Sequence, residues 1–405
     1  MILKLSWRNI WKNRKRSIIT ITAIGFAVFL ALAMRSLQLG TYDHMINNMV
    51  KSTSGPLRIN YTPYIDESNL DNALFNDSID VRGIKSVDGV QEVLFRIESY
   101  GLVALENNTK PLSILATDFV REDPYLQLRS HLIEGEVPDN GNSGIVIGKG
   151  VAERLKCGIG DTLAIISQGF QGVSAAQKFH VVGIVELFSA LYNDQTVFMT
   201  RETGEYFFSM PGMSTTVVVQ ADRMKGLSKM EDKIAGLLTS DLTIRDWTIY
   251  MKEIQQAIVA DDAGGIIMVV ILYMVITFGI FGTILMMTSE RIYEFGVLIS
   301  IGFGRLKLIS QVLLEIVILS MIGVVAGAIL SYPLMYYFKI NPIKLGGEMA
   351  EGMKNMGWDP LMASTTDPML IVTHALIILV VSIIMTLYPI ITIAKVKPVE
   401  AMRTI

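Results

Sequence analysis

The chain has 405 residues, of which 51% are hydrophobic and 18% are charged, and its formal net charge is −3. Soluble proteins carry about 25% charged residues, so this composition excludes an ordinary soluble protein, yet it is too polar for a chain embedded in a membrane throughout. The slightly negative charge argues against a nucleic-acid-binding domain, which would be strongly basic. Cys157 is the single cysteine, so no internal disulfide can form and a large domain must rely on its own core.

Four apolar stretches are long enough to cross a membrane. A helix that spans about 30 Å of hydrocarbon needs about 20 mostly apolar residues. The stretches that meet this requirement are 18–39, 266–287, 308–332 and 370–394. The third contains Glu315 as its only charged residue, and the fourth contains His374.

The first stretch has two interpretations. A basic start, an apolar segment and Ala31-Leu32-Ala33 are also typical of a cleaved signal peptide. The apolar helical pattern continues past that site to Leu39, which favours a membrane span. Before it, Trp7 and Trp11 share one helical face, as in an amphipathic helix that lies along the membrane surface.

Lysine and arginine near the span ends predict the orientation, because they are enriched on the cytoplasmic side. Such residues precede the first span, separate the second from the third, and follow the fourth: Lys4, Arg8, Lys12, Arg14, Lys15 and Arg16; Arg291, Arg305 and Lys307; Lys395, Lys397 and Arg403. We therefore expect both termini in the cytoplasm. The predicted domains are an elbow helix and first span (1–39), an extracytoplasmic domain with a helical stalk (40–265), and a three-span permease domain (266–405).

The outer segment alternates strand-like and helix-like patterns, which predicts a mixed α+β domain. The expected strands are 56–61, 93–100, 112–117, 162–167, 179–185, 196–199 and 215–219. The expected helices are 150–155 and 221–238, the second of which has apolar residues at helical spacing. Residues 118–195 read as an insertion in the rest of the domain.

No constellation of residues predicts catalysis. The four histidines lack metal-ligand spacing, and no nucleophile or metalloprotease motif is present. The segment 144–150 resembles a phosphate-binding loop, but its spacing fails and Gly150 stands where a serine or threonine would hold magnesium. His374 is compatible with a proton relay or with a hydrogen-bonded packing role. We therefore expect no enzymatic activity and no cofactor in this chain.

Glu315 is the most informative single residue, because a carboxyl within a span is costly and usually faces a partner or a cavity. One interpretation is a gating or coupling contact with Arg291 or Arg305. The other is a side chain that reaches toward the nearby membrane surface.

The segment 290–330 reads ERIYEFGVLISIGFGRLKLISQVLLEIVILSMIGVVAGAIL. It resembles the signature of the FtsX-like permease family of ABC transporters. Pro389 and the closing PVEAMR of 398–403 resemble that family's C-terminal pattern, and Trp7-Arg8-Asn9-Ile10 resembles its basic entry helix. In the outer domain, 145–161 and 179–185 resemble lipoprotein-releasing permeases of the LolC/LolE type, and MacB-type efflux permeases share the four-span layout.

The resemblance implies a cytoplasmic coupling helix that meets an ATP-binding-cassette subunit. The positions that carry it are Glu290, Arg291, Glu294, Phe295, Gly296, Leu298, Ile299 and Gly302. The implied partners are an ATPase dimer, which binds ATP and magnesium, and a second permease, either the same chain or a paralogue. The implied location is a bacterial inner membrane, with the large domain in the periplasm.

We expect a device that transmits ATPase motion to the outer domain, with lipoproteins of the outer leaflet as cargo for a periplasmic carrier. Met34, Leu37 and Met268 are candidates for an apolar cavity that would hold acyl chains. Two alternatives are a MacB-type efflux permease for peptides or small molecules and an FtsX-type regulator of a cell-wall hydrolase.

Overall fold

The computed structural model describes residues 2–139, 141, 143–187, 190–355 and 360–395. The chain divides into two compact units. The helix unit comprises Met1–Tyr42, Ala257–Ile343 and Leu361–Ile405, and the sheet unit comprises Asp43–Gln256 and Lys344–Pro360. The closing motif of 398–403 lies outside the described residues.

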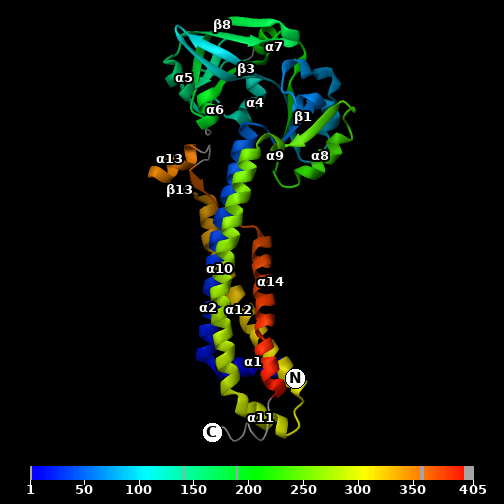
Figure 1. The fold of residues 1–405 in the computed structure, drawn as a ribbon, viewed down its shortest axis with the longest axis vertical. Helices are drawn as coiled ribbons and strands as arrows, with labels where there is room; N and C mark the ends of the chain where they lie inside the picture. The colour runs from blue at the N-terminus through cyan, green and yellow to red at the C-terminus, as the bar shows by residue number, and fades with distance from the viewer. Residues whose placement is uncertain (1, 140, 142, 188–189, 356–359, 396–405) are drawn as a thin grey trace. The chain divides into compact units, whose positions relative to one another are not determined.

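The helix unit is built around membrane-length helices (Figure 1). Among the described residues, four helical segments are long and apolar enough to span a membrane: Arg14–Val50, Lys252–Glu290, Arg305–Ile340 and Pro368–Lys395. Its helices are α1 (Ile2–Lys12), α2 (Arg14–Met45), α10 (Lys252–Glu290), α11 (Ile292–Ser300), α12 (Arg305–Ile340), α14 (Pro368–Met385) and α15 (Leu387–Lys395). The π-helix η1 (Ile46–Val50), which continues α2 along the chain, and α13 (Gly347–Asn355) fall within the residues of the sheet unit. The short strands β13 (Ile343–Lys344) and β14 (Leu361–Met362) flank α13.

Helices α2 and α12 approach closely because small residues face each other. A Cβ added at Gly327 would lie 2.5 Å from the carbonyl oxygen of Gly25 and 2.8 Å from Cβ of Val28. Small residues let helix backbones meet in a membrane, where apolar burial alone gives little drive for association. Helix α12 also packs against α1, α14 and α15, which makes it the centre of the bundle.

The sheet unit contains a ten-stranded mixed sheet. Its order is β12-β1-β11-β3-β4-β9-β6-β8-β5, and β7 pairs with β3 and β8. The strands are β1 (Leu57–Tyr61), β3 (Val90–Leu105), β4 (Asn108–Thr117), β5 (Leu132–Gly135), β6 (Ile145–Gly148), β7 (Thr162–Gln168), β8 (Ser174–Val185), β9 (Thr196–Thr200), β11 (Thr216–Ala221) and β12 (Leu242–Asp246). A separate ribbon joins β2 (Leu74–Phe75) to β10 (Met213–Ser214).

Short helices connect these strands. They are α3 (Val81–Lys85), α4 (Phe119–Leu126), α5 (Lys149–Leu155), α6 (Ala190–Gln195), α7 (Arg201–Phe207), α8 (Leu227–Ala235) and α9 (Trp247–Tyr250), with 3₁₀ turns η2 (Thr62–Ile65), η3 (Leu70–Asn72), η4 (Asn76–Ser78) and η5 (Phe170–Gly172).

Strand β3 links two parts of the sheet. Its first half pairs antiparallel with β11, and its second half pairs with β4. The hairpin from β3 to β4 turns at Glu106, whose φ is +49°, as two-residue hairpins require. One apolar core, which includes Ile114, Phe179 and Met199, fills the part of the unit formed by β4 to β9.

The fold class expected from the sequence is confirmed: within the described ranges, membrane-length helices accompany a large α+β domain inserted between the first and second of them. The seven expected strands correspond to β1, β3, β4, β7, β8, β9 and β11. The expected helix 221–238 is shorter, because Gly226 has φ of +85° and α8 begins only after it.

Candidate functional site

A buried carboxylate ties three helices together at one end of the helix unit. Glu315 on α12 is 1% exposed. Its Oε1 accepts hydrogen bonds from Asn9 of α1 at 2.6 Å and from Gln311 of α12 at 3.0 Å. Its Oε2 accepts one from Nη1 of Arg291, the residue before α11, at 2.7 Å. One carboxylate therefore connects the entry helix, the segment between two spans and the central span.

Arg291 is buried beside Glu315, and its guanidinium is paired with carboxylates and stacked on an aromatic ring. Its side chain is 10% exposed and that of Glu315 is 2% exposed. The Arg291 Nε also lies 3.4 Å from Oε2 of Glu294, and its guanidinium stacks over the Phe295 ring at 5.1 Å. Buried charges persist in proteins when they are paired and hydrogen-bonded, so this arrangement stabilises both charges only while both partners are present.

Outer contacts extend the same junction. Ser6 of α1 donates to the carbonyl oxygen of Gln311 at 3.1 Å, and Lys12 reaches Glu294 at 3.0 Å. Partial burial raises the pKa of Glu294, but the hydrogen bond and charge of Lys12, with Arg291, hold that pKa below its usual value. Arg16 pairs with Glu290 at the end of α10. These exposed pairs contribute little stability and mainly fix the positions of the helices.

Helix α11 has a buried face and an exposed face. Phe295 is 1% exposed and Gly296 is also buried, while Leu298 packs partly buried against the same core. The exposed apolar side chains are Tyr293 (47%), Ile301 (74%) and Leu306 (80%), the last at the start of α12. The structure thus places Phe295 inside the bundle, whereas the sequence interpretation placed it on a docking surface. The reason is that Arg291 pairs with Glu315 of α12 and stacks over the Phe295 ring, which holds that face of α11 against α12.

The remaining expected positions lie at the ends of α11. Glu290 is the last residue of α10, and Ile299 is half-buried in the last turn of α11. Gly302 has φ of +91°, a left-handed conformation that glycine adopts without strain, and it lets the chain turn from α11 toward α12. The cavity lined by Arg291, Phe295 and Glu315 has a volume of about 10 Å³, which is enough for one water molecule and excludes a small-molecule ligand.

A second polar cluster joins α2 and α10. Arg35 forms an ion pair with Asp262 at 2.7 Å, and Gln38 donates to the carbonyl oxygen of Asp261 at 2.9 Å. Tyr42 donates a hydrogen bond to the Asp261 carboxylate. This cluster fixes the register of α2 against α10, which run alongside each other in the helix unit (Figure 1).

The three candidates for an acyl-chain cavity are not gathered in one core. Met34 packs partly buried against the core of the helix unit, and Leu37 is half-buried. Met268 is 56% exposed, on a part of α10 that also exposes Ile267 and Ile271. In the single chain, Met268 therefore faces outward.

Sequence reasoning missed Asn9 and Gln311, although both had signals. Gln311 lies four residues before Glu315, a spacing that puts both on one helical face. Asn9 belongs to the entry motif Trp7-Arg8-Asn9-Ile10 but lies about 300 positions away from Glu315, so its partner was invisible.

His374 packs edge-to-face against Tyr273 with ring centroids 5.9 Å apart. Among the described residues, no group of three or more His, Cys, Asp or Glu is arranged to hold a metal ion.

Two parts of the chain match known protein families. Residues 266–398 match the FtsX-like permease C-terminal domain. Residues 17–237, more than half of the chain, match the MacB-like periplasmic core domain. An uncharacterised ABC transporter permease of Methanocaldococcus jannaschii is 23% identical over 415 aligned residues, which cover 99% of this chain and 97% of the relative.

Two solved structures are similar to part of the chain. The extracellular domain of the noncanonic ABC-type transporter YknZ from Gram-positive bacteria is 16% identical, with 47% of this chain and 99% of that chain covered and a TM-score of 0.34. The periplasmic region of MacB from Actinobacillus actinomycetemcomitans is 13% identical, with 52% and 97% covered and a TM-score of 0.36.

Proposed function

This chain belongs to the family of ABC transporter permeases with an FtsX-like C-terminal domain and a MacB-like core domain, and from this premise we propose that it transmits ATPase motion mechanically. The observation that carries the proposal is the carboxylate of Glu315, which connects α1, α11 and α12 through Asn9 and Arg291. A force applied to α11 would therefore move α1 and α12 with it. Packed elements joined by buried polar networks shift as units between discrete arrangements.

The docking surface for the ATPase is formed by three exposed apolar side chains: Tyr293 on α11, Ile301 directly after α11, and Leu306 at the start of α12. These exposed apolar side chains lie near charged Glu290 and Glu294, and an apolar helix face of this kind fits a groove on a partner protein. We propose that the segment from Glu290 to Gly302 is the coupling segment that receives the motion of the ATPase. Its buried members, Phe295 and Leu298, hold the segment to the bundle and leave the exposed ones to the partner.

In this proposal the ATPase is a separate subunit that binds ATP and magnesium and carries out the hydrolysis. A second permease, the same chain or a paralogue, completes the assembly. The basic segments before α2 and between α10 and α12 support an orientation with both termini in the cytoplasm. In a bacterial inner membrane this puts the sheet unit in the periplasm.

The spans favour transmission over a polar pore. Within the described part of α10, α12 and α14, the apolar windows carry few charged residues, and Glu315 is occupied by Arg291. Polar translocation paths need several intramembrane polar groups. Cargo handled beside the membrane is compatible with this, and our preferred cargo is a lipoprotein drawn from the outer leaflet for a periplasmic carrier. The match to the MacB-like core domain favours a second candidate, efflux of peptides or small molecules.

The docking surface is tested by variants in nanodiscs. Tyr293→Asp combined with Leu306→Asp should abolish binding of the ATPase, measured by biolayer interferometry, while the thermal unfolding of the permease stays unchanged. Met349→Asp, which places the same charge at an exposed apolar residue of α13, is the control. Wild-type affinity in the double variant would show that α11 does not dock the ATPase.

The cargo is tested by reconstitution with the ATPase and a lipid-anchored protein. ATP-dependent release of that protein from the membrane supports lipoprotein extraction. Transport of a peptide without release of lipoprotein supports efflux instead.

A further inference from the structure

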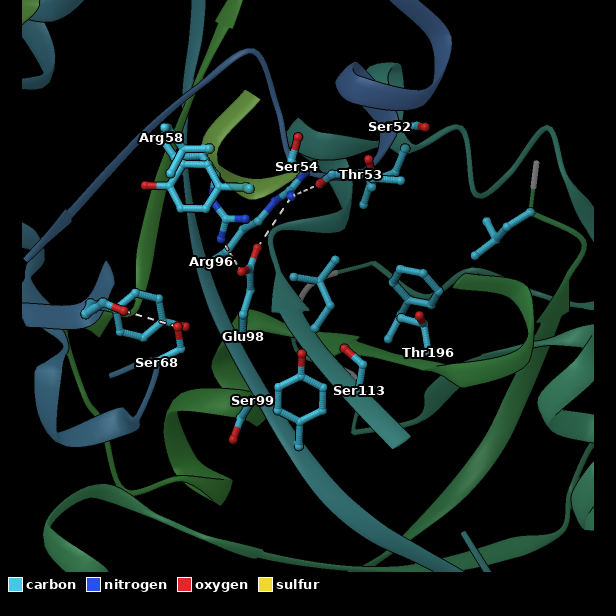
Figure 2. Close-up of a pocket in the computed structure, with 18 of the residues that line it drawn as sticks. Ser52, Thr53, Ser54, Arg58, Ser68, Arg96, Glu98, Ser99, Ser113 and Thr196 are labelled. Atoms are coloured by element: carbon cyan, nitrogen blue, oxygen red, sulfur yellow. Dashed lines mark hydrogen bonds and ion pairs between the residues drawn. The ribbon is translucent and has the colours of Figure 1, made fainter. Parts of the chain in front are cut away.

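The sheet unit contains a pocket of about 380 Å³ that none of the coupling residues line (Figure 2). Its volume falls in the range of small-molecule sites, about 300–1,000 Å³. The floor is the face of the sheet formed by β3, β4 and β9. Figure 2 shows Arg58, Arg96 and Glu98 gathered at one side, with Ser113 and Thr196 on neighbouring strands.

The register of the strands puts a row of polar side chains beside a row of apolar side chains on the floor of the pocket. Tyr100, Ser113 and Thr196 are direct cross-strand partners, so their hydroxyl groups form one row on a single face. Two residues along each strand, Leu115 and Phe198 form the next row and are apolar. A ligand on this floor would meet hydroxyl groups at one side and an apolar surface in the middle.

Among the described residues that line this pocket, two buried polar atoms have neither a hydrogen bond nor an ion pair, whereas Nη2 of Arg96 lacks a hydrogen bond but is ion-paired with Glu122. Within the described ranges, Nε of Arg58 and Oγ1 of Thr196 have no partner, although these residues are only 7% and 3% exposed. Buried polar groups in folded proteins are nearly always satisfied, so an unsatisfied pair lining one cavity points to a molecule that binds there. We propose that this pocket is a binding site for a small organic monoanion, a carboxylate carried on an apolar or aromatic body.

The charges at the pocket favour an anion over a cation. Glu98 already pairs with Arg58 and lies 3.7 Å from Arg96, so it is occupied by cations of the chain itself. Arg96 is in turn paired with Glu122, which is fully buried. With Lys252 at the rim, three cationic groups (Arg58, Arg96 and Lys252) face two anionic ones (Glu98 and Glu122), which leaves one positive charge.

The Tyr64 hydroxyl adds no negative charge to the pocket, so the net charge stays at one positive charge. Burial, with the charge of Glu98, raises the pKa of Tyr64 to about 12, so that its hydroxyl stays neutral near pH 7. A single excess positive charge matches a monoanion better than a doubly charged phosphate monoester. The free Nε–H of Arg58 donates to a carboxylate oxygen, and Leu115 and Phe198 receive the apolar body.

The pocket is lined by the two chain segments that connect the sheet unit to α2 and α10. One wall is made by Thr53 and Ser54, which follow η1, the segment that continues α2 along the chain. Another is made by Ile249 and Tyr250 in α9, directly before α10. A bound molecule would therefore contact both segments through which the membrane-length helices join the sheet unit. Arg96 already links to this wall, since its Nη1 donates to the Thr53 carbonyl oxygen.

Binding is tested with the full chain in nanodiscs by isothermal titration calorimetry, without the ATPase, so that it is independent of the coupling function. The probes are N-acetylphenylalanine and 4-phenylbutanoate, each compared with its neutral amide. At least one acid should bind about tenfold or more tightly than its amide, because hydrogen bonds to charged groups are the stronger ones. Preference for N-acetylphenylalanine indicates a peptide C-terminus, and preference for 4-phenylbutanoate indicates a non-peptide acid.

Two variants locate the site. Thr196→Val removes one unsatisfied hydroxyl with little change in shape, and Arg58→Lys keeps the charge beside Glu98 but removes the Nε–H donor. Both should weaken acid binding about fivefold or more with unfolding temperatures near wild type. Thr109→Val, at an exposed position on β4, should bind as wild type does. Equal binding of acid and amide, no binding of either acid at millimolar concentration, or unchanged affinity in both variants would overturn the proposal.

Discussion

Replacing Glu315 with alanine removes the carboxylate that holds Arg291 and Asn9 in the helix unit. At the 2.7 Å separation of Arg291 Nη1 and Glu315 Oε2, the gross attraction is about 6 kcal/mol for an effective dielectric constant of about 20. Desolvation offsets part of this, and breaking a buried pair from one side typically destabilises by about 3–5 kcal/mol. We expect Glu315→Ala to lose about that much and to loosen α11 from α12.

Removing both charges should restore most of the stability, because no uncompensated charge then remains buried. The measurement is a double-mutant cycle of Arg291→Met and Glu315→Leu, followed by thermal unfolding in nanodiscs and by ATPase stimulation. We expect the double variant to be more stable than Glu315→Leu alone yet defective in coupling, since the link to α1 is gone. A double variant as unstable as the single one, or one that couples normally, would refute the role of this ion pair.

Three further predictions follow from buried and exposed groups. Phe295→Asp should destabilise the helix unit strongly, because Phe295 is 1% exposed, whereas Tyr293→Asp should not; equal unfolding temperatures of the two variants would contradict the assigned faces of α11. Gly327→Ala should destabilise the α2–α12 contact by about 1–3 kcal/mol, because its Cβ would lie 2.5 Å from the Gly25 carbonyl oxygen, while Gly279→Ala, with open space around it, should be tolerated. Burial raises the pKa of Glu92, but hydrogen bonds from Lys85, the Val93 amide and Arg121 outweigh it and lower the pKa to about 2. The ionised carboxylate therefore stabilises the sheet unit fully above its unfolded pKa of about 4.3, and this stabilisation is lost as the pH falls toward 2. Unfolding temperatures measured from pH 6 to pH 2 should fall less steeply in Glu92→Gln than in wild type, and parallel curves would argue against the depressed pKa.

The sequence predicted the spans because a run of about 20 apolar residues has few alternative structures. Seven of the ten strands of the large sheet were also predicted, since β-branched runs such as Thr216–Ala221 are bounded by turns, whereas β5, β6 and β12 were missed. The extension of β3 to Leu105 was missed, because its second half contains glycine and alternates weakly. This second half is a strand because it pairs with β4, a contact that local sequence preference does not reveal.

The coupling site was predictable in position but not in packing. Glu315 with Arg291 was one of two interpretations of the sequence, and the distance of 2.7 Å now supports the contact. The burial of Phe295 could not be read from α11 alone, because a nine-residue helix that is apolar on both sides does not reveal which side meets α12. The pocket at Arg58 and Thr196 was also beyond prediction, since its walls come from stretches far apart in the chain, which include 52–68, 96–100, 113–115, 196–198 and 249–252.

The most direct test of the central claim is native purification of this chain from its membranes in mild detergent, followed by mass spectrometry of the proteins retained with it. A permease that transmits ATPase motion should retain an ATP-binding-cassette subunit in stoichiometric amount. Retention should persist in Met349→Asp and be lost in the Tyr293→Asp, Leu306→Asp double variant. Recovery of the wild-type chain with no such ATPase would contradict the account.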